Sequence, residues 1–426
     1  MKIVMDSANN KIFYRLIKEL SWTDRLLPVI IILSIVLGTL ISVYDPSARN
    51  AFDSQHRLAG VSAPLAVGLI IMMIPPLCKV EWENIHNILR QKRIYTQLVI
   101  SLILNWIVCP LLMVALAWMA LFNDEEYRTG IIMIGVARCI AMVLVWNELA
   151  GGDNTLCIII VVMNSILQML LYAPYQIFLC YIISNTPRSG SSVSYQLVAK
   201  SVGVFLGIPF GFGLLIRLGS LCIFGKKIYE KKLLPLISPW SLIGLVYTII
   251  VIFIARGDDF IKNIGQAFKC FIPLTVYFVI TWFGTLFFMR YFSNYVNRKK
   301  IQAVGEEEPL IRCGCEKTME RESAENKWKM WCGAKYGETI TQTFTAASNN
   351  FELSLSIAIS IYGSGSKQSI AATFGPLLEV PILLFLTVVA KYFQLKLLWN
   401  DDEIANDKID SSNVEGNKID LCQSAK

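Results

Sequence analysis

The run GIIMIGVARCIAMVLVWNEL, residues 130–149, has the length and apolarity of a membrane-spanning helix but carries a charged residue near its middle. A spanning helix needs about 20 mostly apolar residues. Arg138 stands beside Cys139 near the midpoint, and a charge at that depth costs roughly 2.5–3.5 kcal/mol on insertion scales. Such a residue faces a bundle interior or a cavity rather than lipid. The run therefore predicts a membrane protein with a polar interior.

The composition of the whole chain agrees with this prediction. Of its 426 residues, 54% are hydrophobic and 17% are charged, against about 25% charged residues in soluble domains. The apolar runs give ten candidate spans: 26–44, 60–78, 96–122, 130–149, 156–183, 198–221, 235–255, 264–289, 340–361 and 369–390. We therefore expect an all-α polytopic membrane protein with ten transmembrane helices in a lipid bilayer.

Lysine and arginine predict the orientation of these spans. Of the 39 basic residues, 28 lie in one alternate set of connecting segments: 1–25, 79–95, 150–155, 222–234, 290–339 and 391–426. The other set holds 7: 45–59, 123–129, 184–197, 256–263 and 362–368. Basic residues accumulate in cytoplasmic loops. Both tails, 1–25 and 391–426, are therefore predicted to be cytoplasmic.

The spans divide into two groups of five. One group occupies 26–183, an extracellular linker follows at 184–197, and the second group occupies 198–289 and 340–390. Five spans per half give the halves opposite orientations, as in transporters built from two inverted repeats. The second half is interrupted by a charged segment, 290–339, that we interpret as a cytoplasmic loop insert.

The insert carries three cysteines, and their role is open. Cys313, Cys315 and Cys332 are soft ligands that suit a thiophilic metal or metalloid. The alternative is that they are simple thiols in a linker.

The fourth span of the second half is as unusual as that of the first. The run TITQTFTAASNNFELSLSIAIS, from residue 339, places Asn349, Asn350 and Glu352 around its midpoint. Interrupted polar helices at mid-depth, one per repeat, point to a transporter's binding site. We expect the fourth and ninth helices to be discontinuous, near Gly135 and near the two asparagines, and to cross at the site. The alternative is that these polar groups only hold helices together.

Three residues offer chemistry at this site. The thiol of Cys139 is a potential soft ligand, and the neighbouring Arg138 would favour its thiolate. Glu352 is a carboxyl group in a cavity and is therefore a candidate to load and release protons. Glu379, in the run GPLLEVP at 375–381, is predicted to be either a proton relay or a structural partner of Arg138.

Weaker candidates lie elsewhere in the spans. Cys78 ends the second span after two prolines, and it either contacts a passing solute or packs. Asn105 in the third span is expected to form a hydrogen bond between helices. The glycines at 203, 207 and 211 form a stripe that predicts close helix contact.

Several functional classes are disfavoured. The chain has only two histidines and no Walker A, H-E-x-x-H, C-x-x-C or dinucleotide-binding motif. We therefore expect no catalytic residues, no resident metal and no cofactor. Nucleic-acid binding is disfavoured because the basic residues form short clusters between apolar runs.

Five runs resemble a known family. They are IMMIPPLCKVEWE (71–83), LNWIVCPLLMVALAWMALF (104–122), IGVARCIAMVLVWNELAGGDN (134–154), SNNFELSLSIAI (348–359) and AATFGPLLEVPILL (371–384). Together they closely resemble the arsenite efflux permeases of the arsenical-resistance-three family, in particular its fungal plasma-membrane members. The resemblance spans residues from about 20 to 400, except for the insert.

The resemblance implies a function as well as a fold. It implies two inverted five-helix repeats in the bile acid/arsenite transporter superfamily. It also implies export of trivalent arsenite, and antimonite in some members, in exchange for protons. The family's key cysteine and glutamate match Cys139 and Glu352, and its essential charged positions match Arg138 and Glu379. With Asn349 and Asn350, these form the predicted site.

Two other functions compete with this one. A sodium-coupled organic-anion symporter on the same fold would not require Cys139. A membrane sensor would use the thiols of the 290–339 insert to report metalloid. The oligomeric state is left open.

Overall fold

The computed structural model describes residues 22–52, 57–84, 92–140, 142–184, 195–262, 264–304, 333–363, 366–397 and 399–400. The three insert cysteines Cys313, Cys315 and Cys332 lie outside the described residues, as do most of both predicted tails. The roles expected of these segments therefore stay predictions.

The described chain is almost entirely helical, with one two-residue hairpin. Its longer elements are α2 (Trp22–Tyr44), α4 (Ala63–Cys78), α6 (Lys92–Ile103), α7 (Cys109–Ala120), α8 (Glu125–Val136), α9 (Met142–Ala150), α10 (Asn154–Ile177), α11 (Tyr195–Val202), α12 (Ile208–Ile228), α14 (Pro239–Lys262), α15 (Ile264–Val304), α16 (Tyr336–Ala347), α17 (Phe351–Tyr362) and α18 (Lys367–Lys396). The shorter ones are α3 (Pro46–Phe52), β1 (Arg57–Leu58), β2 (Val61–Ser62), η1 (Trp82–Asn84), η2 (Leu104–Val108), η3 (Phe178–Ile183), η4 (Gly203–Gly207), η5 (Tyr229–Leu233) and α13 (Leu234–Ile237).

Each of the ten predicted spans coincides with helical structure. By length and apolarity alone, five helical stretches of the described chain could cross a membrane, or six if α2 and α3, bent by 113°, count as one span. The predicted all-α polytopic membrane protein is therefore confirmed. The count of ten stays a prediction, because several predicted spans are short or broken and two of them fall within one continuous stretch, Val198–Asp258.

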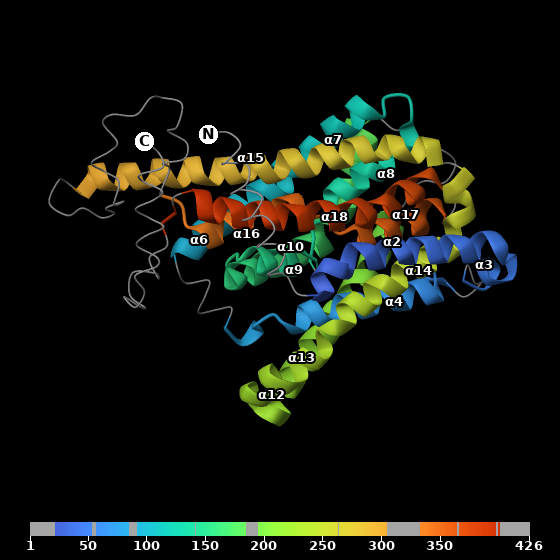
Figure 1. Ribbon diagram of the computed structural model, residues 1–426, viewed down its shortest axis with the longest axis horizontal. Helices are drawn as coiled ribbons and strands as arrows, with labels where there is room; N and C mark the ends of the chain where they lie inside the picture. Colours follow the sequence, from blue (N-terminus) through green and yellow to red (C-terminus); the bar gives the residue numbers. More distant parts are fainter. Residues whose placement is uncertain are drawn as a thin grey trace, which may run out of the picture.

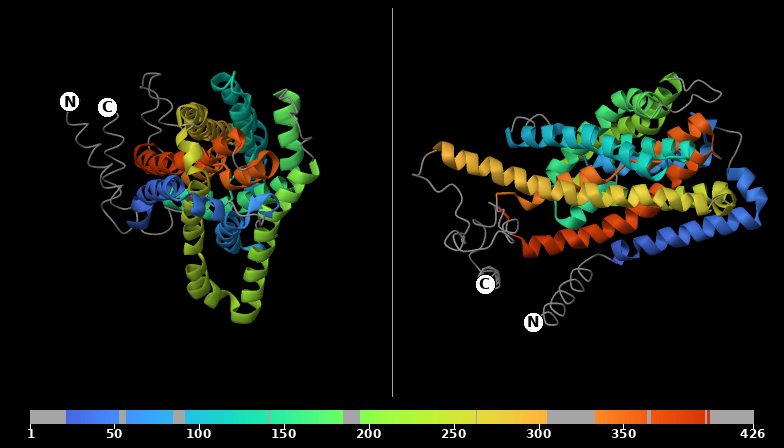
Figure 2. Two further views of the ribbon diagram at one scale, coloured as in Figure 1. Left: turned by 90° about the vertical axis from the view of Figure 1, so that its right-hand side faces the viewer. Right: turned by 90° about the horizontal axis from the view of Figure 1, so that it is seen from above.

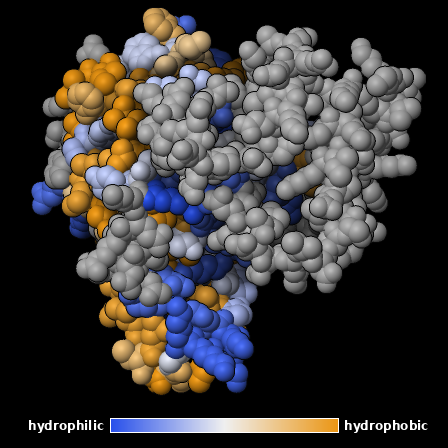
Figure 3. Space-filling model, turned by 90° about the vertical axis from the view of Figure 1, so that its left-hand side faces the viewer, coloured by the Kyte–Doolittle hydropathy of each residue, from blue (hydrophilic) through white to orange (hydrophobic). Residues whose placement is uncertain are grey.

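That stretch turns back on itself. Gly225 has a φ of 75° and a ψ of 161° inside α12, which interrupts the helix. Figure 2 shows the resulting U, in which α12 runs outward and α14 returns. Lys226, Lys227, Lys231 and Lys232 are exposed at this turn. Figure 3 shows hydrophilic side chains on the protruding lobe and hydrophobic ones along its flank, as expected where a helical hairpin leaves the membrane.

The helices form two bundles (Figure 1). In the four-helix bundle, α14 packs on α2 and α4, and α12 packs on α4. In the second bundle, which we call the site bundle, α15 packs on α7, α16 and α18, while α18 also packs on α8 and α17. The contact within the four-helix bundle is close: a Cβ on Gly244 would lie 2.9 Å from the backbone of Met72.

Helix α15 is longer than the sequence predicts. It has 41 residues and so spans about 60 Å, twice the roughly 30 Å hydrocarbon core of a bilayer. The first part of the predicted insert, from residue 290 to Val304, is therefore helical, and the start of the insert at residue 290 stays a prediction. No glycine or proline occurs between Gly284 and Gly305, so nothing in the sequence stops the helix at the membrane surface.

One of two predictions about glycines is wrong. The 203, 207 and 211 stripe makes no close helix contact, because a Cβ on any of the three would meet no atom within 4 Å. The fourth predicted helix does break near Gly135, but Gly135 itself lies in the last turn of α8, two residues before the extended Ala137. A Cβ on Gly135 would lie 2.5 Å from the side chain of Met113, so Gly135 serves the packing of α8 on α7.

Gly375 provides a direct test of the packing in the site bundle. A Cβ on Gly375 of α18 would overlap the Phe351 ring of α17. We expect Gly375→Ala to destabilise the protein by about 1–3 kcal/mol, the usual cost of overpacking. The control Gly211→Ala meets no neighbour and should leave stability unchanged or slightly raised. Thermal unfolding in detergent compares them, and equal melting temperatures would contradict this packing.

Candidate functional site

Two broken helices meet at the centre of the site bundle. Helix α8 ends at Val136 and α9 begins at Met142, and Ala137 between them is extended. Helix α16 ends at Ala347 and α17 begins at Phe351, with Ser348 also extended. The predicted discontinuous fourth and ninth helices are therefore confirmed.

The two extended segments satisfy each other's backbone. Arg138 and Asn349 form an antiparallel bridge, and the Asn350 N–H donates to the Ala137 carbonyl at 3.0 Å. Non-helical backbone at membrane depth is tolerated only where protein or a cavity replaces lipid around it. The two breaks therefore depend on each other, and the crossing itself is confirmed.

The pairing gives the crossing two different faces. Successive side chains of an extended chain point to opposite sides. In antiparallel pairing, Cys139 is opposite Ser348 when Arg138 is opposite Asn349. We call the side of Arg138 and Asn349 the anchor face, and the side of Cys139 and Ser348 the thiol face.

On the anchor face, Arg138 binds the crossing together. It is fully buried, and its Nη1 donates to the Tyr277 hydroxyl at 3.2 Å. Its Nη2 donates to the Gly135 carbonyl and to Asn349 Oδ1. Its backbone N–H donates to Gln168 Oε1. The guanidinium thus holds the end of α8 against the other segment through neutral oxygens.

Tyr277 completes the anchor face from α15. Its hydroxyl donates to the Ala346 carbonyl at 3.2 Å, and the Cys109 thiol donates to the same carbonyl at 3.4 Å. The sequence reasoning missed Tyr277, Cys109 and the contact of Gln168 with Arg138. Tyr277 and Cys109 lie in mostly apolar helices, whereas Gln168 shares a helix with Asn164, and no local pattern identifies the partner of any of them.

Arg138 forms no ion pair with Glu352 or Glu379 in the part of the chain that the structure describes. The Ser348 hydroxyl donates to Glu379 instead. The structure therefore does not support Glu379 as a structural partner of Arg138. The role of Glu379 as a proton relay stays a prediction.

On the thiol face, Cys139 sits at the start of a helix. Its Sγ accepts the Val143 N–H at 3.3 Å, in the first turn of α9, and the residue is 4% exposed. A helix N-terminus carries partial positive charge. Arg138, whose field was predicted to favour this thiolate, lies on the anchor face, so the partial charge beside the Cys139 Sγ is that of α9.

Two carboxyl groups face this thiol. Glu379 and Glu352 both act electrostatically on Cys139. Glu352 lies in the first turn of α17, where the Asn350 side chain caps the helix by accepting the Leu353 N–H at 3.1 Å. Glu352 is 9% exposed, and its carboxylate accepts a hydrogen bond from its own backbone N–H but has no side-chain partner among the described residues.

Unpaired donors lie beside the same groups. The Nδ2 atoms of Asn349 and Asn350 are buried without a partner among the described residues. A buried amide left unpaired costs about 1–3 kcal/mol. The crossing therefore offers hydrogen-bond donors to a bound solute or water next to a thiol and a carboxyl group.

Other contacts hold the half-helices in place. Phe351 packs against Gly375 of α18, and the Ser354 hydroxyl donates to the Met133 carbonyl of α8 at 3.2 Å. At the far end of α16, Thr341 donates to Asn147 Oδ1 at 2.8 Å. Each half of the ninth helix is thus fixed to a half of the fourth.

Cys78 lies outside this site, in the four-helix bundle. It is buried, and its thiol donates to the Gly213 carbonyl of α12 at 3.8 Å. Arg217 donates to the Cys78 carbonyl at 3.1 Å and to both carboxylate oxygens of Glu83. Burial of Glu83 raises its pKa, but the bonds from Arg217 outweigh this and lower the pKa below its ordinary value. The surroundings of Cys78 thus favour its packing role.

Asn105 also lies apart from the crossing. It is in the π-helical turn η2, and its Nδ2 donates to Ser101 Oγ at 2.8 Å on the same helix. The expected bond between helices is instead made by the adjacent Trp106, which donates to Asn164 Oδ1 at 3.1 Å. Neither Cys78 nor Asn105 contacts Cys139 or Glu352 in the described structure.

Two broken helices that cross around polar groups inside a helical membrane bundle are the architecture of a secondary transporter. Residues 66–263 match the sodium bile acid symporter family. The chain is 33% identical over 399 residues to the arsenical-resistance protein Acr3 of Corynebacterium glutamicum, covering 93% of this chain and 96% of that protein. It is 24% identical to the Acr3 of Alkaliphilus metalliredigens, covering 88% and 93% of the two chains. An uncharacterized transporter of Synechocystis is 25% identical, covering 86% and 88%.

The chain belongs to the Acr3 arsenical-resistance family, as the sequence motifs predict. It is a multi-pass membrane transporter of the arsenical-resistance class and not an enzyme.

The anchor face gives a prediction with a matched control. Tyr277→Phe removes the hydroxyl that links Arg138 to Ala346. Tyr175→Phe removes a hydroxyl that donates to the Trp106 carbonyl at 2.6 Å, away from the crossing. Each should cost about 1–3 kcal/mol of stability, but only Tyr277→Phe should reduce transport severalfold in everted vesicles. Equal transport by the two variants would show that the anchor face does not position the site.

Proposed function

We propose that the protein exports trivalent arsenite from the cytoplasm in exchange for protons, using Cys139 and Glu352 at the crossing. The observation that carries this proposal is one buried thiol facing two carboxyl groups beside unpaired amide donors. The printed names of two relatives, both arsenical-resistance proteins, support a trivalent arsenical as the solute.

The thiol supplies the specific chemistry. Arsenous acid, As(OH)3, is neutral near pH 7 and enters a desolvated site without the cost of burying a charge. The Cys139 S–H condenses with one As–OH group, so that an S–As bond forms and one water molecule leaves. Hydrolysis of the S–As bond reverses the step. A single thiol allows release, whereas three thiols would hold arsenic too firmly for turnover.

The polar groups around the thiol orient the solute. The unpaired Nδ2 of Asn350, and that of Asn349 after a small rotation, donate to the remaining arsenic hydroxyls. Arg138 acts as a positioning residue, since its guanidinium donors reach Tyr277, Gly135 and Asn349.

Glu352 couples this binding to protons. It is the carboxyl group on the thiol face without a side-chain partner in the described structure, so a proton or a solute hydroxyl can reach it. Protonation from the outside would weaken the hold on the metalloid and favour the return step. Glu379 accepts a hydrogen bond from the Ser348 hydroxyl. A change in the charge of Glu379 would therefore reach the Asn349–Asn350 segment, which follows Ser348.

The remaining assignments follow from the chemistry and from the sequence. Antimonite, also trivalent and thiophilic, would use the same thiol. We also propose that both termini lie in the cytoplasm, which the distribution of lysine and arginine supports, and that the protein lies in the plasma membrane, which the family resemblance supports.

Removing the thiol tests the solute assignment. Cys139→Ala should lower arsenite accumulation in everted vesicles at least tenfold, because no soft ligand remains at the crossing. The control is Cys157→Ala, which removes another buried thiol in α10 and should retain transport. Near-normal transport by a folded Cys139→Ala protein would overturn the thiol assignment.

Replacing Glu352 tests the coupling. Glu352→Gln keeps the shape of the side chain but cannot release a proton. We expect it to lose stimulation by a pH gradient while still exchanging labelled for unlabelled arsenite at equilibrium. The control Glu148→Gln, at an exposed position of α9, should keep both activities. Undiminished stimulation of Glu352→Gln by the gradient would assign coupling to another group.

The match to the sodium bile acid symporter family favours one alternative, sodium-coupled transport of an organic anion. The same vesicles distinguish the two functions. Uptake that follows an imposed Na+ gradient, ignores pH and survives Cys139→Ala would support the alternative.

A further inference from the structure

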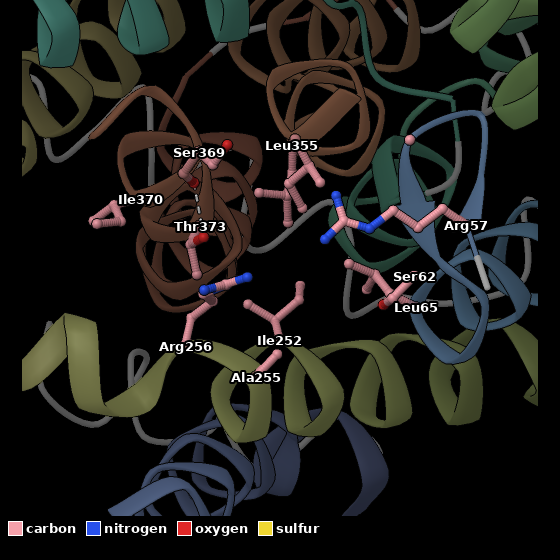
Figure 4. A pocket seen from close by; sticks show the side chains of 12 residues that line it. Arg57, Ser62, Leu65, Ile252, Ala255, Arg256, Leu355, Ser369, Ile370 and Thr373 are labelled. Carbon is pink, nitrogen blue, oxygen red and sulfur yellow. Dashed lines mark hydrogen bonds between the residues drawn. The ribbon is translucent and has the colours of Figure 1, made fainter. Parts of the chain in front are cut away.

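A small cavity lies between the two bundles at the end of the molecule predicted to face outside the cell (Figure 4). Its volume is about 30 Å³, room for roughly two water molecules. The four-helix bundle and its hairpin contribute Arg57, Ser62 and Arg256, and the site bundle contributes residues of α17 and α18. The cavity is thus a gap where the two bundles face each other.

The cavity shares a helix face with Glu352. Leu355 and Ile359 line it, and they follow Glu352 on α17 by three and seven residues. Residues at that spacing lie on one side of a helix. At 1.5 Å per residue, Ile359 is about 10 Å from Glu352 along the helix axis. This face of α17 therefore leads from the thiol face of the crossing to the cavity.

A strained turn closes the cavity against α17. Ala59 and Gly60 join β1 to β2, with φ of 47° and 85°, the signs expected for a type I′ hairpin. Ala59 is the one non-glycine residue with positive φ among the described residues, and that conformation costs about 1–2 kcal/mol. Such strain persists where contacts impose it, often at gates and sites.

Those contacts come from Ser360 of α17. Its hydroxyl donates to the Ala59 carbonyl, and a Cβ on Gly60 would lie 2.8 Å from Ser360 Cα. A hairpin between α3 and α4 of one bundle is thus fastened to a helix of the other by one hydrogen bond and close backbone contact.

The lining fits a small hydroxylated solute. Ser62, Ser369 and Thr373 carry hydroxyl groups, and the Arg57 and Arg256 side chains extend from two opposite sides (Figure 4). Hydroxyls and guanidinium groups suit a neutral or anionic oxygen-rich molecule and disfavour a cation. The present volume is too small for a solute with three hydroxyl groups around arsenic.

Resting on the proposed function, we propose that this cavity is the closed outer exit of the transport path for arsenous acid. The Ala59–Gly60 turn is its gate, and the hydrogen bond from the Ser360 hydroxyl to the Ala59 carbonyl holds this gate closed. Separation of the hairpin and α14 from α17 and α18 opens the exit, and closure restores the strained turn.

A disulfide across the gate tests this proposal. The built Gly60 Cβ lies 3.1 Å from Ser360 Cβ, close to the 3.5–4.5 Å range of disulfides. In the double variant Gly60→Cys/Ser360→Cys, oxidation should lower arsenite export at least tenfold, and a reducing agent should restore it. Oxidant should not change the activity of either single variant. Peptide mass spectrometry confirms the bond.

Two results would overturn the gate. One is undiminished export by a double variant that is fully cross-linked, and the other is a pair that stays reduced under oxidant. Wild-type export separates the proposals: if wild type exports no arsenite, the proposed function fails. If wild type and the cross-linked variant export equally, only the gate fails.

External labelling gives a second measurement. Ser62→Cys lines the cavity, whereas Ser42, near the C-terminal end of α2, is also buried but does not line the cavity, so Ser42→Cys is the control. A membrane-impermeant thiol reagent added outside should label the Ser62 variant faster once the cytoplasm contains arsenite, and leave the Ser42 variant unchanged. Equal rates for the two variants, or labelling of the Ser62 variant only from inside, would overturn the proposal.

Discussion

The pairing of two short extended segments, Ala137–Cys139 with Ser348–Asn350, is the interaction on which the rest of the structure depends. Inside a bilayer, backbone that leaves the helix loses its hydrogen bonds and cannot recover them from water. Each break here recovers part of them from the other, through the Arg138–Asn349 bridge and the Asn350 N–H bond to Ala137. The break in the helix of one half of the protein therefore depends on the break in the helix of the other half.

Successive side chains of an extended segment point to opposite sides, so the neighbouring residues Arg138 and Cys139 have different roles. Arg138 points to one side, where Tyr277, Asn349 and the Gly135 carbonyl occupy its guanidinium. Cys139 points to the other, toward Ser348 and the two carboxyl groups. A costly buried charge thus stabilises the crossing without occupying the site. Helix α11, which continues into α12, packs on α10 and α17, and α2 packs on α18, so the two bundles are in contact around this centre.

Much of this arrangement was predictable because misplaced polar groups are expensive in lipid. Otherwise apolar runs are interrupted by Arg138, Asn349, Asn350 and Glu352, so both breaks and the residues at the crossing could be predicted from the sequence.

The partners of these residues were not predictable. The sequences around Tyr277 and Gln168 do not indicate which residues they contact. Their roles follow from their hydrogen bonds to Arg138 across the bundle. The glycine stripe at 203, 207 and 211 led to a wrong prediction of close helix contact for the same reason. Close packing requires a partner helix, and sequence spacing does not reveal one. The tight contact of Gly375 with Phe351, which sets the position of Glu352, likewise appears only in three dimensions.

In the proposed mechanism one thiol, Cys139, binds arsenic directly and reversibly. Arsenic K-edge X-ray absorption of the purified protein loaded with arsenite measures the atoms bonded to the metalloid. We expect one sulfur and two oxygen neighbours in the wild type, and three oxygens in Cys139→Ser. Three sulfur neighbours in the wild type, or an unchanged spectrum in the variant, would contradict it.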